Sequence, residues 1–308
     1  MIQNRSSQLD PLDLDWRSNF KRLEGAYAPS TIRSYFSDVG AFVRWCEEQN
    51  KDPFPALPKS VCEFLVHQGS LFAPSTVQRR LYAIRKAHAL MGLPDPTRDE
   101  DVNLALRRVR RAKSTRPKQA KGLTSEFLNA LIDAQPNNPI GLRNKAMLSL
   151  GYELLARRSE LVALLTDDVT IRPDRTMRVL IRRSKSDPFG QGRVAFTSCQ
   201  TAQLISEWLA WRGPHIRPLF CQVYAGKALN RALGTTSVKD LIKRSAQAAG
   251  FDPWLVDQFS GHSLRVGAAQ DLLCRGHNIA AIMRAGGWKS VGVLQRYLEE
   301  AEHNVWNH

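Results

Sequence analysis

The C-terminal part of the chain contains four side chains whose types and spacing suit phosphoryl transfer. They are His262, Arg265, Trp288 and Tyr297. A histidine and an arginine three residues apart on a helix lie on the same face, and a tryptophan N–H can join them around one anionic group. A tyrosine hydroxyl can then supply the attacking oxygen. Three donors and one nucleophile predict attack on a phosphate without a metal ion.

Two stretches upstream offer the groups that such a reaction still needs. Arg157 and Arg158 lie between two apolar helical patterns, and Lys185 lies where a predicted strand enters its turn. Guanidinium groups present paired donors that match phosphate oxygens. The leaving alkoxide needs a proton, which arginine holds too tightly, whereas the pKa of a lysine can be lowered near other cations. Lys185 is therefore a better general acid than Arg182 or Arg183.

Each of these residues also has a plainer explanation when taken alone. Adjacent arginines beside an apolar run are often surface charge, and a lysine at a turn is usually only exposed. His262 alone is typical of a hydrogen-bonded core histidine, and Tyr297 alone is typical of packing. The catalytic interpretation depends on all of them occurring in one chain.

The charge of the chain predicts an anionic partner. The 308 residues include 44 Lys and Arg against 29 Asp and Glu, a net charge of +15. A basic protein that is merely soluble is the alternative, but the excess is clustered. Dense like charges repel unless an anion neutralises them, so we expect a polyanion contact along one basic run. This run contains no acidic residue and consists of Arg107, Arg108, Arg110, Arg111, Lys113, Arg116, Lys118 and Lys121.

The cysteines and the N-terminus point to a reducing compartment. None of the five cysteines stands in a Cys-x-x-Cys pair, and no Cys/His cluster has the spacing of metal ligands. Free thiols are typical of a reducing compartment. The N-terminus lacks the apolar core of a signal peptide, and no stretch approaches the length of a membrane span. We therefore expect a cytoplasmic protein that uses no metal and no cofactor.

Length and periodicity predict two domains and a fold that is mainly α with a small antiparallel β-sheet. Residues 1–25 are polar and are expected to form a loose arm. Residues 26–111 hold four or five helical patterns, two of which begin with the same Ala-Pro-Ser-Thr string, a helix-start signal. Residues 112–122 have the composition of a basic linker. The second domain, 123–308, alternates with period two over 169–197 and is helical from 201 onwards.

The active-site residues, taken in order, resemble those of the tyrosine recombinases, the phage integrase family. The strings SGHSLRVGAAQD, IMRAGGWKSV and RY are similar to the Cre-like branch in particular. The resemblance covers nearly the whole chain and includes Trp45-Cys46, Gly92-Leu93-Pro94 and Leu106-Arg107-Arg108-Val109-Arg110. It implies a helical core-binding domain and an α+β catalytic domain that form a C-shaped clamp on DNA.

The resemblance also implies a role for each residue of the site. Tyr297 would attack the scissile phosphate, giving a 3′-phosphotyrosine and a free 5′-hydroxyl. Arg157 and Arg265 would bind the non-bridging oxygens, and Lys185 would protonate the leaving 5′ oxygen.

Three further residues take supporting roles by the same resemblance. His262 would assist proton transfer at the tyrosine, and Trp288 would donate a hydrogen bond. Glu160 would orient Arg157, which fits the family's arginine–acid spacing better than Arg158 does. Members of the family recombine double-stranded DNA at inverted-repeat sites, through a Holliday junction, as tetramers on two paired sites. They require neither ATP nor a metal ion.

Expected DNA contacts lie on predicted helices and in the basic run. A helix fits the major groove, and the candidates outside the run are Arg33, Gln78, Arg79, Arg85, Lys86, Lys239, Lys243 and Arg244. A type IB topoisomerase is the alternative enzyme, and a non-catalytic DNA-binding protein is the alternative of another class. The HSLRVGAA string and the separate helical domain argue against the first. Competent residues at every catalytic position argue against the second.

Overall fold

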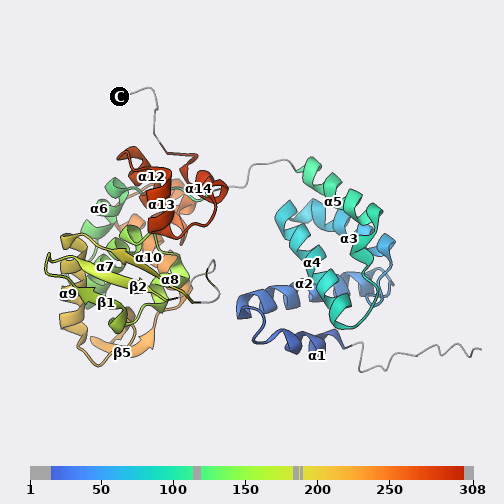
Figure 1. Ribbon diagram of the computed structural model, residues 1–308, viewed down its shortest axis with the longest axis horizontal. Coiled ribbons are helices and arrows are strands. Elements are labelled where there is room, and N and C mark those ends of the chain that lie inside the picture. The colour runs from blue at the N-terminus through green and yellow to red at the C-terminus, as the bar shows by residue number, and fades with distance from the viewer. Residues whose placement is uncertain (1–14, 114–118, 183–186, 188–189, 302–308) are drawn as a thin grey trace, which may run out of the picture. The chain divides into compact units, whose positions relative to one another are not determined.

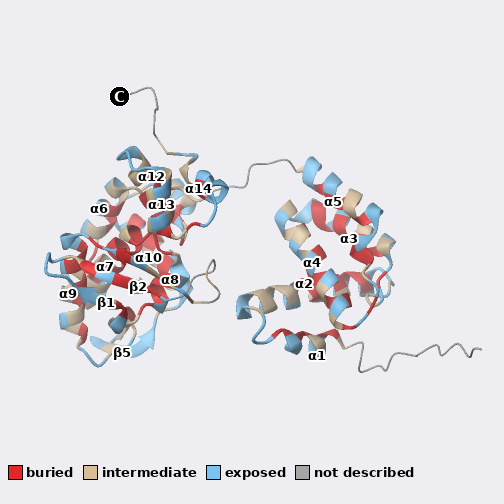
Figure 2. Ribbon diagram, in the orientation of Figure 1, coloured by how far each residue is buried: buried red, intermediate tan, exposed pale blue. Residues whose placement is uncertain are grey.

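The computed structural model divides into two compact units, Met1–Pro117 and Lys118–His308 (Figure 1). It describes residues 15–113, 119–182, 187 and 190–301. Each unit has its own buried core (Figure 2), and we describe the two separately. Among the described residues, no helix combines the length and the apolar character needed to cross a membrane.

The N-terminal unit is helical throughout its described part. Its two longest helices begin with Pro29 and Pro74, as expected, but Ala28 and Ala73 precede them and no side-chain hydrogen bond caps either one. The fixed φ of proline at the first helical position therefore starts both helices, rather than a serine or threonine hydroxyl. The elements are α1 (Trp16–Phe20), η1 (Lys21–Leu23), α2 (Pro29–Glu48), α3 (Pro58–Leu71), α4 (Pro74–Leu90), η2 (Pro96–Arg98) and α5 (Glu100–Ala112).

The prediction that residues 1–25 form a loose arm is wrong for the second half of this segment. Residues 16–23 form α1 and η1, and the side chains of Trp16, Phe20 and Leu23 are buried. These apolar residues recur at helical spacing and pack in a small core with Val39 of α2. The burial of three large side chains outweighs the polar character of the residues between them. Residues 1–14 lie outside the described part of the chain.

The C-terminal unit consists of a three-stranded antiparallel sheet packed against helices (Figure 1). The strands pair in the order β1 (Val169–Ile171), β2 (Met177–Ile181) and β3 (Arg193–Phe196). Alternate residues of β2 are buried, which confirms the predicted period of two. The helices are α6 (Ser125–Asp133), α7 (Pro139–Glu153), α8 (Arg158–Ala163), η3 (Thr166–Asp168), α9 (Cys199–Arg212), α10 (Thr235–Ala248), α11 (Pro253–Gln258), α12 (Ser263–Cys274), α13 (Ile279–Gly286) and α14 (Val291–Leu298).

A second sheet lies where continuous helix was expected after residue 201. The strands β4 (Cys221–Tyr224) and β5 (Lys227–Ala232) form an antiparallel hairpin. Its two turn residues, Ala225 and Gly226, have φ values of 46° and 73°, as a tight hairpin turn with two positive φ angles requires. The prediction failed because β5 is almost entirely exposed and Ala-Gly is a weaker turn signal than Asn-Gly.

The segment that enters the C-terminal unit is hydrogen-bonded to the end of α11 and to the start of α12. The backbone N–H of Lys121 donates to the carbonyl of Gln258 at 3.2 Å, and that of Leu123 donates to the carbonyl of Ser263 at 2.9 Å. A Cβ at Gly267 would lie 1.9 Å from the carbonyl oxygen of Leu123. Close backbone packing therefore holds residues 121–123 against the helix that carries Arg265.

The buried His88 predicts that acid destabilises the N-terminal unit. Its Nε2 accepts a hydrogen bond from the backbone of Ala56, so Nδ1 donates to the carbonyl of Ile84 and the ring is neutral. Burial lowers the pKa of His88 from its ordinary value of 6.5. Because the unfolded chain binds the proton more readily, the free energy of unfolding should fall as the pH drops below about 6.5, by at most about 1.4 kcal/mol per pH unit.

Urea unfolding of the full chain between pH 5 and pH 8 measures this dependence. The variant His88→Gln keeps an acceptor but no titratable ring, so its stability should change less over the same range. Equal pH dependence in the two proteins would contradict the assignment.

Candidate active site

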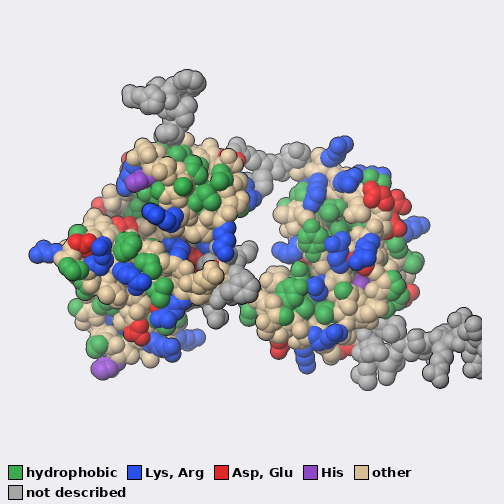
Figure 3. Space-filling view, in the orientation of Figure 1, with side chains coloured by type: hydrophobic (Ala, Val, Ile, Leu, Met, Phe, Trp, Pro, Cys, Tyr) green, Lys and Arg blue, Asp and Glu red, His purple; other side chains and the backbone are tan. Residues whose placement is uncertain are grey.

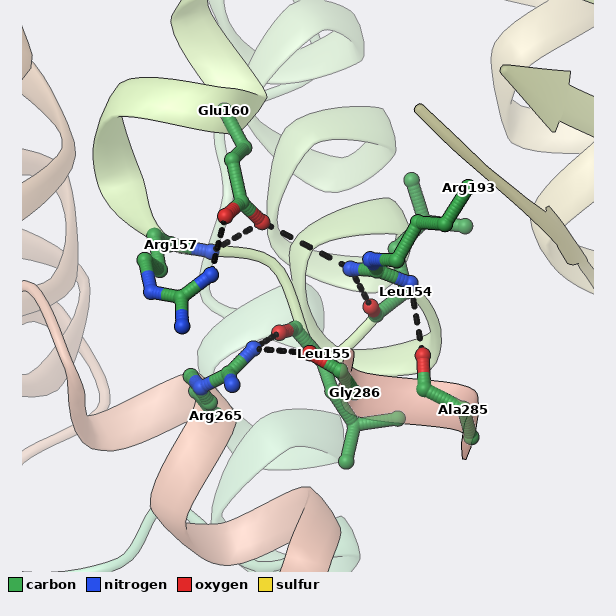
Figure 4. Close-up of polar contacts among 8 residues, drawn as sticks. All are labelled: Leu154, Leu155, Arg157, Glu160, Arg193, Arg265, Ala285 and Gly286. Atoms are coloured by element: carbon green, nitrogen blue, oxygen red, sulfur yellow. Dashed lines mark hydrogen bonds and ion pairs between the residues drawn. The ribbon is translucent and has the colours of Figure 1, made fainter. Parts of the chain in front are cut away.

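The guanidinium of Arg265 lies at the centre of the candidate site. Its side chain is fully buried in the first turn of α12. Its Nη1 donates to the carbonyl oxygens of Leu155 and Gly286, the latter at 2.9 Å (Figure 4). Burial and then the neighbouring Arg157 lower the pKa of Arg265 to about 10, so the group stays cationic at neutral pH. Its Nε and Nη2 are buried and have no hydrogen-bond partner among the described residues.

Arg157 and Glu160 form the second element of the site. Arg157 precedes the first turn of α8, and its Nη1 donates to Glu160 Oε1 at 2.5 Å. The backbone N–H of Arg157 donates to the other carboxylate oxygen at 3.1 Å. Arg158 is exposed. The contact with Glu160, whose carboxylate is buried, therefore belongs to Arg157, the residue that we selected from the sequence.

Arg193 is a residue of the site that the sequence analysis missed. It begins β3, pairs with the buried Ile181 of β2, and holds its Nη2 3.5 Å from Glu160 Oε2. It also donates to the carbonyls of Ala285 at 2.6 Å and Leu154 at 2.7 Å (Figure 4). Burial lowers the pKa of Arg193. The alternation of the strand could have predicted this residue, because side chains two positions apart on a strand lie on the same face and Ala195 faces inward.

Trp288 and Tyr297 complete the site from the C-terminal helices. Gly287 ends α13 in the left-handed conformation and turns the chain so that the ring of Trp288 covers Arg265, 3.8 Å from the guanidinium carbon. The ring of Tyr297, on α14, contacts that of Trp288 edge-on with centroids 5.3 Å apart. The Nε1 of Trp288 is buried without a hydrogen-bond partner among the described residues. The same chain therefore supplies the tyrosine and the arginine beside it.

Two predicted catalytic residues are placed differently or not described. His262 is the N-cap residue of α12 and is exposed, whereas Arg265, three residues further along, is fully buried. Lys185 and Arg183 lie outside the described residues. Arg182, which we judged a poorer general acid than Lys185, forms an ion pair with Asp168.

The candidate DNA contacts fall into an exposed group and an engaged group. Gln78 donates to the hydroxyl of Tyr82, Lys86 lies over the ring of Tyr27, and Lys121 is partly buried. Arg116 and Lys118 lie outside the described residues. The exposed members are Arg33, Arg107, Arg108, Arg110, Arg111, Lys239 and Arg244. The members bound to protein oxygens are Arg79 with Asp38, Arg85 with Thr97, Lys113 with Ser70, and Lys243 with Asp257.

Comparison with known proteins identifies the family of the chain. The model of the phage integrase family matches residues 121–304. An integrase/recombinase xerD homolog of Selenomonas ruminantium is 30% identical over 91% of this chain and 84% of its own length. The recombinase cre of Escherichia phage P1 is 27% identical over 90% of this chain and 86% of its own. The chain belongs to the phage integrase family, whose members are site-specific tyrosine recombinases that cleave and rejoin DNA.

Solved structures share the fold. A complex of the XerH site-specific recombinase with a palindromic difH substrate superposes with a TM-score of 0.66 at 18% identity, covering 90% of this chain and 80% of that one. A dimer of lambda integrase residues 75–356 bound to a COC′ core site gives 0.63 at 14% identity, covering 94% and 96%. The predicted fold class, mainly helical with small antiparallel sheets, is confirmed.

Adding a methyl group at Gly286 should disturb the aromatic cover of the site. A Cβ there would lie 1.9 Å from Cζ3 of Trp288, so Gly286→Ala must displace the indole from Arg265. We expect a loss of about 1–3 kcal/mol in the free energy of unfolding, as in other overpacked cores, and slower formation of the covalent adduct. Urea unfolding and the adduct assay described below measure both.

Gly292→Ala is the matched control. Gly292 lies on α14, where an added Cβ meets nothing closer than 3.9 Å. It should retain stability and adduct formation. If Gly286→Ala has the stability and adduct formation of this control, the close packing of Gly286 against the indole does not position Trp288.

Proposed function

We propose that Tyr297 is the nucleophile of a site-specific DNA recombinase and that Arg157, Arg265 and Trp288 bind the scissile phosphate. The observation that carries the proposal is the contact of the tyrosine ring with Arg265 and Trp288, whose buried donors have no hydrogen-bond partner in the described part of the chain. Buried donors require an acceptor, and a phosphate offers several oxygens. The tyrosine oxygen would attack phosphorus while the 5′ oxygen leaves, giving a 3′-phosphotyrosine.

The electrostatics of the site favour an anionic ligand. Arg157, Arg193 and Arg265 lie around a single carboxylate, that of Glu160. The lowered pKa values of Arg193 and Arg265 reflect burial first and neighbouring cations in addition. A phosphate that gains charge during attack would relieve this excess of positive charge. Donors fixed in advance stabilise such a transition state without reorganising.

We assign proton transfer to Lys185 and His262. Lys185 would protonate the leaving 5′ oxygen, because its pKa can be lowered near cations whereas arginine keeps its proton. His262, at the start of α12, would assist at the tyrosine hydroxyl. Glu160 would hold Arg157 in position through its two hydrogen bonds. No step of this scheme calls for ATP or a metal ion.

The DNA partner and the assembly follow from the relatives. The XerH and lambda integrase structures are complexes with recombination-site DNA, and we extend this partner to the present chain. The predicted residues 26–111, together with α1 and η1, would form the core-binding domain, residues 112–122 the basic linker, and residues 123–308 the catalytic domain of a clamp on the duplex. Lys and Arg side chains occur over the visible face of both units (Figure 3). Four chains on two paired inverted-repeat sites would exchange strands through a Holliday junction.

The covalent adduct tests the nucleophile. The substrate is a duplex carrying the site, obtained by sequencing bound genomic fragments, with a nick beside the cleavage point. After attack, the short strand diffuses away and the protein stays on the 3′ phosphate, visible as a shifted band in a denaturing gel. Tyr297→Phe should abolish this band, because phenylalanine has no attacking oxygen.

Tyr224→Phe serves as the matched control, since Tyr224 is 75% exposed at the end of β4. It should form adduct at the wild-type rate. An adduct that survives Tyr297→Phe would remove Tyr297 from its proposed role.

The salt dependence of binding tests the phosphate contacts of α5. Each neutralised phosphate contributes about −0.9 to the slope of log affinity against log salt. The double variant Arg110→Gln/Arg111→Gln should therefore flatten the slope by up to about 1.8. Arg175→Gln, at a turn residue outside the proposed contacts, should leave it unchanged. Fluorescence anisotropy between about 50 and about 200 mM salt gives both slopes. Identical slopes for the two variants would exclude α5 from the phosphate contacts.

A further inference from the structure

The helix that carries Tyr297 has few restraints of its own. The helix α14 has eight residues, and Leu294 is its only side chain classed as buried. So short a helix is marginal by itself, and its last carbonyl groups have no partner within the helix. The position of the tyrosine therefore depends on contacts with neighbouring elements. On the side-chain side, the ring rests against Trp288.

A glutamine on α12 supplies the contact on the backbone side. The side chain of Gln270 is buried, and its Nε2 donates to the carbonyl oxygen of Tyr297 at 3.2 Å. Gln270 lies five residues after Arg265 on the same helix. One helix thus holds both the central phosphate-binding candidate and the backbone of the candidate nucleophile.

The other end of the same amide touches the segment that leads in from the linker. A Cβ at Gly122 would lie 2.0 Å from Gln270 Oε1 and 3.2 Å from the Cα of Gly267. Only glycine at this position leaves room for the amide. The neighbouring residues Lys121 and Leu123 are hydrogen-bonded to the residues around the start of α12, so Gly122 cannot easily move away.

We propose that Gln270 is a positioning residue for the nucleophile, wedged between Gly122 and the carbonyl of Tyr297. It fixes the end of α14, and with it the tyrosine, relative to the arginine on its own helix. Gly122, at the end of the predicted linker, packs against this amide and so restricts its position. The linker end therefore influences the position of Tyr297 through Gln270. The inference rests on the proposed role of Tyr297 as nucleophile.

A comparison of two nucleophiles tests the proposal in the full-length protein. Gln270→Met keeps the length of the side chain and removes the donor. Adduct formation on the nicked duplex should slow by about tenfold, within the range that small misplacements of a reacting group produce. In a Tyr297→Phe background, hydrogen peroxide replaces the tyrosine: the peroxide anion attacks phosphorus and the 5′ oxygen leaves with a proton. Gln270→Met should not change the rate of this peroxide cleavage, because the phosphate site is intact.

Two further variants complete the design. Gly122→Ala reaches the same amide from the opposite side and should show the same selective loss of the tyrosine reaction. Gln203→Met removes a glutamine hydrogen bond on the exposed face of α9, to Glu207 at 3.0 Å, and should change neither reaction.

The outcomes separate this inference from the proposed function. If Gln270→Met and Gly122→Ala slow both reactions equally, the residue only maintains packing and the proposal is wrong. If they leave the tyrosine reaction at the wild-type rate, the proposal is also wrong, although Tyr297→Phe still abolishes the adduct. An adduct that persists in Tyr297→Phe would instead overturn the proposed function itself.

Discussion

The buried charge of Arg265 is the constraint on which the C-terminal unit depends. Removing a guanidinium from water costs several kcal/mol, on the order of the penalty for any buried ion, unless hydrogen bonds compensate. Here the carbonyls of Leu155 and Gly286 accept two of them. Those carbonyls belong to the turn after α7 and to the end of α13, so the charge ties three parts of the unit together. The remaining donors, Nε and Nη2, are the ones that we propose bind the phosphate.

The turn between α7 and α8 shows how much one short segment must satisfy. Its carbonyls at Leu154 and Leu155 accept hydrogen bonds from Arg193 and Arg265, and it ends in Arg157 itself. Leu155 has a φ of 46°, a conformation that residues other than glycine rarely adopt. Such strain persists only where the surroundings fix it, and it is common at functional sites. The hydrogen bonds that Arg193 and Arg265 donate to these carbonyls hold the turn in this conformation.

The aromatic side chains link this polar centre to the C-terminal helices. Trp288 lies against the guanidinium of Arg265 at 3.8 Å, close enough for a cation–π interaction in a desolvated setting. The ring of Tyr297 contacts the indole edge-on and itself lies 5.8 Å from the guanidinium carbon of Arg265. Because Gly286 and Gly287 permit the close turn before Trp288, the ends of α13 and α14 are placed by the same interaction that stabilises the charge. The proposed phosphate-binding arginine and the proposed nucleophile, Tyr297, are thus connected through one buried cation.

The sequence by itself determined the fold class, the family, and the identity of the candidate residues. Helix starts at Pro29 and Pro74, and the alternation of β2, follow from local backbone and periodic constraints that short segments express on their own. Only the tertiary structure decided that Trp16 and Phe20 are buried, that β4 and β5 pair, and that Arg193 and Gln270 contact the site. Those features depend on which surfaces meet, and residues as far apart as Arg193 and Glu160, or Gln270 and Tyr297, meet only when the core closes. The residue types indicated the chemistry of the site, whereas the positions of its side chains depend on tertiary packing.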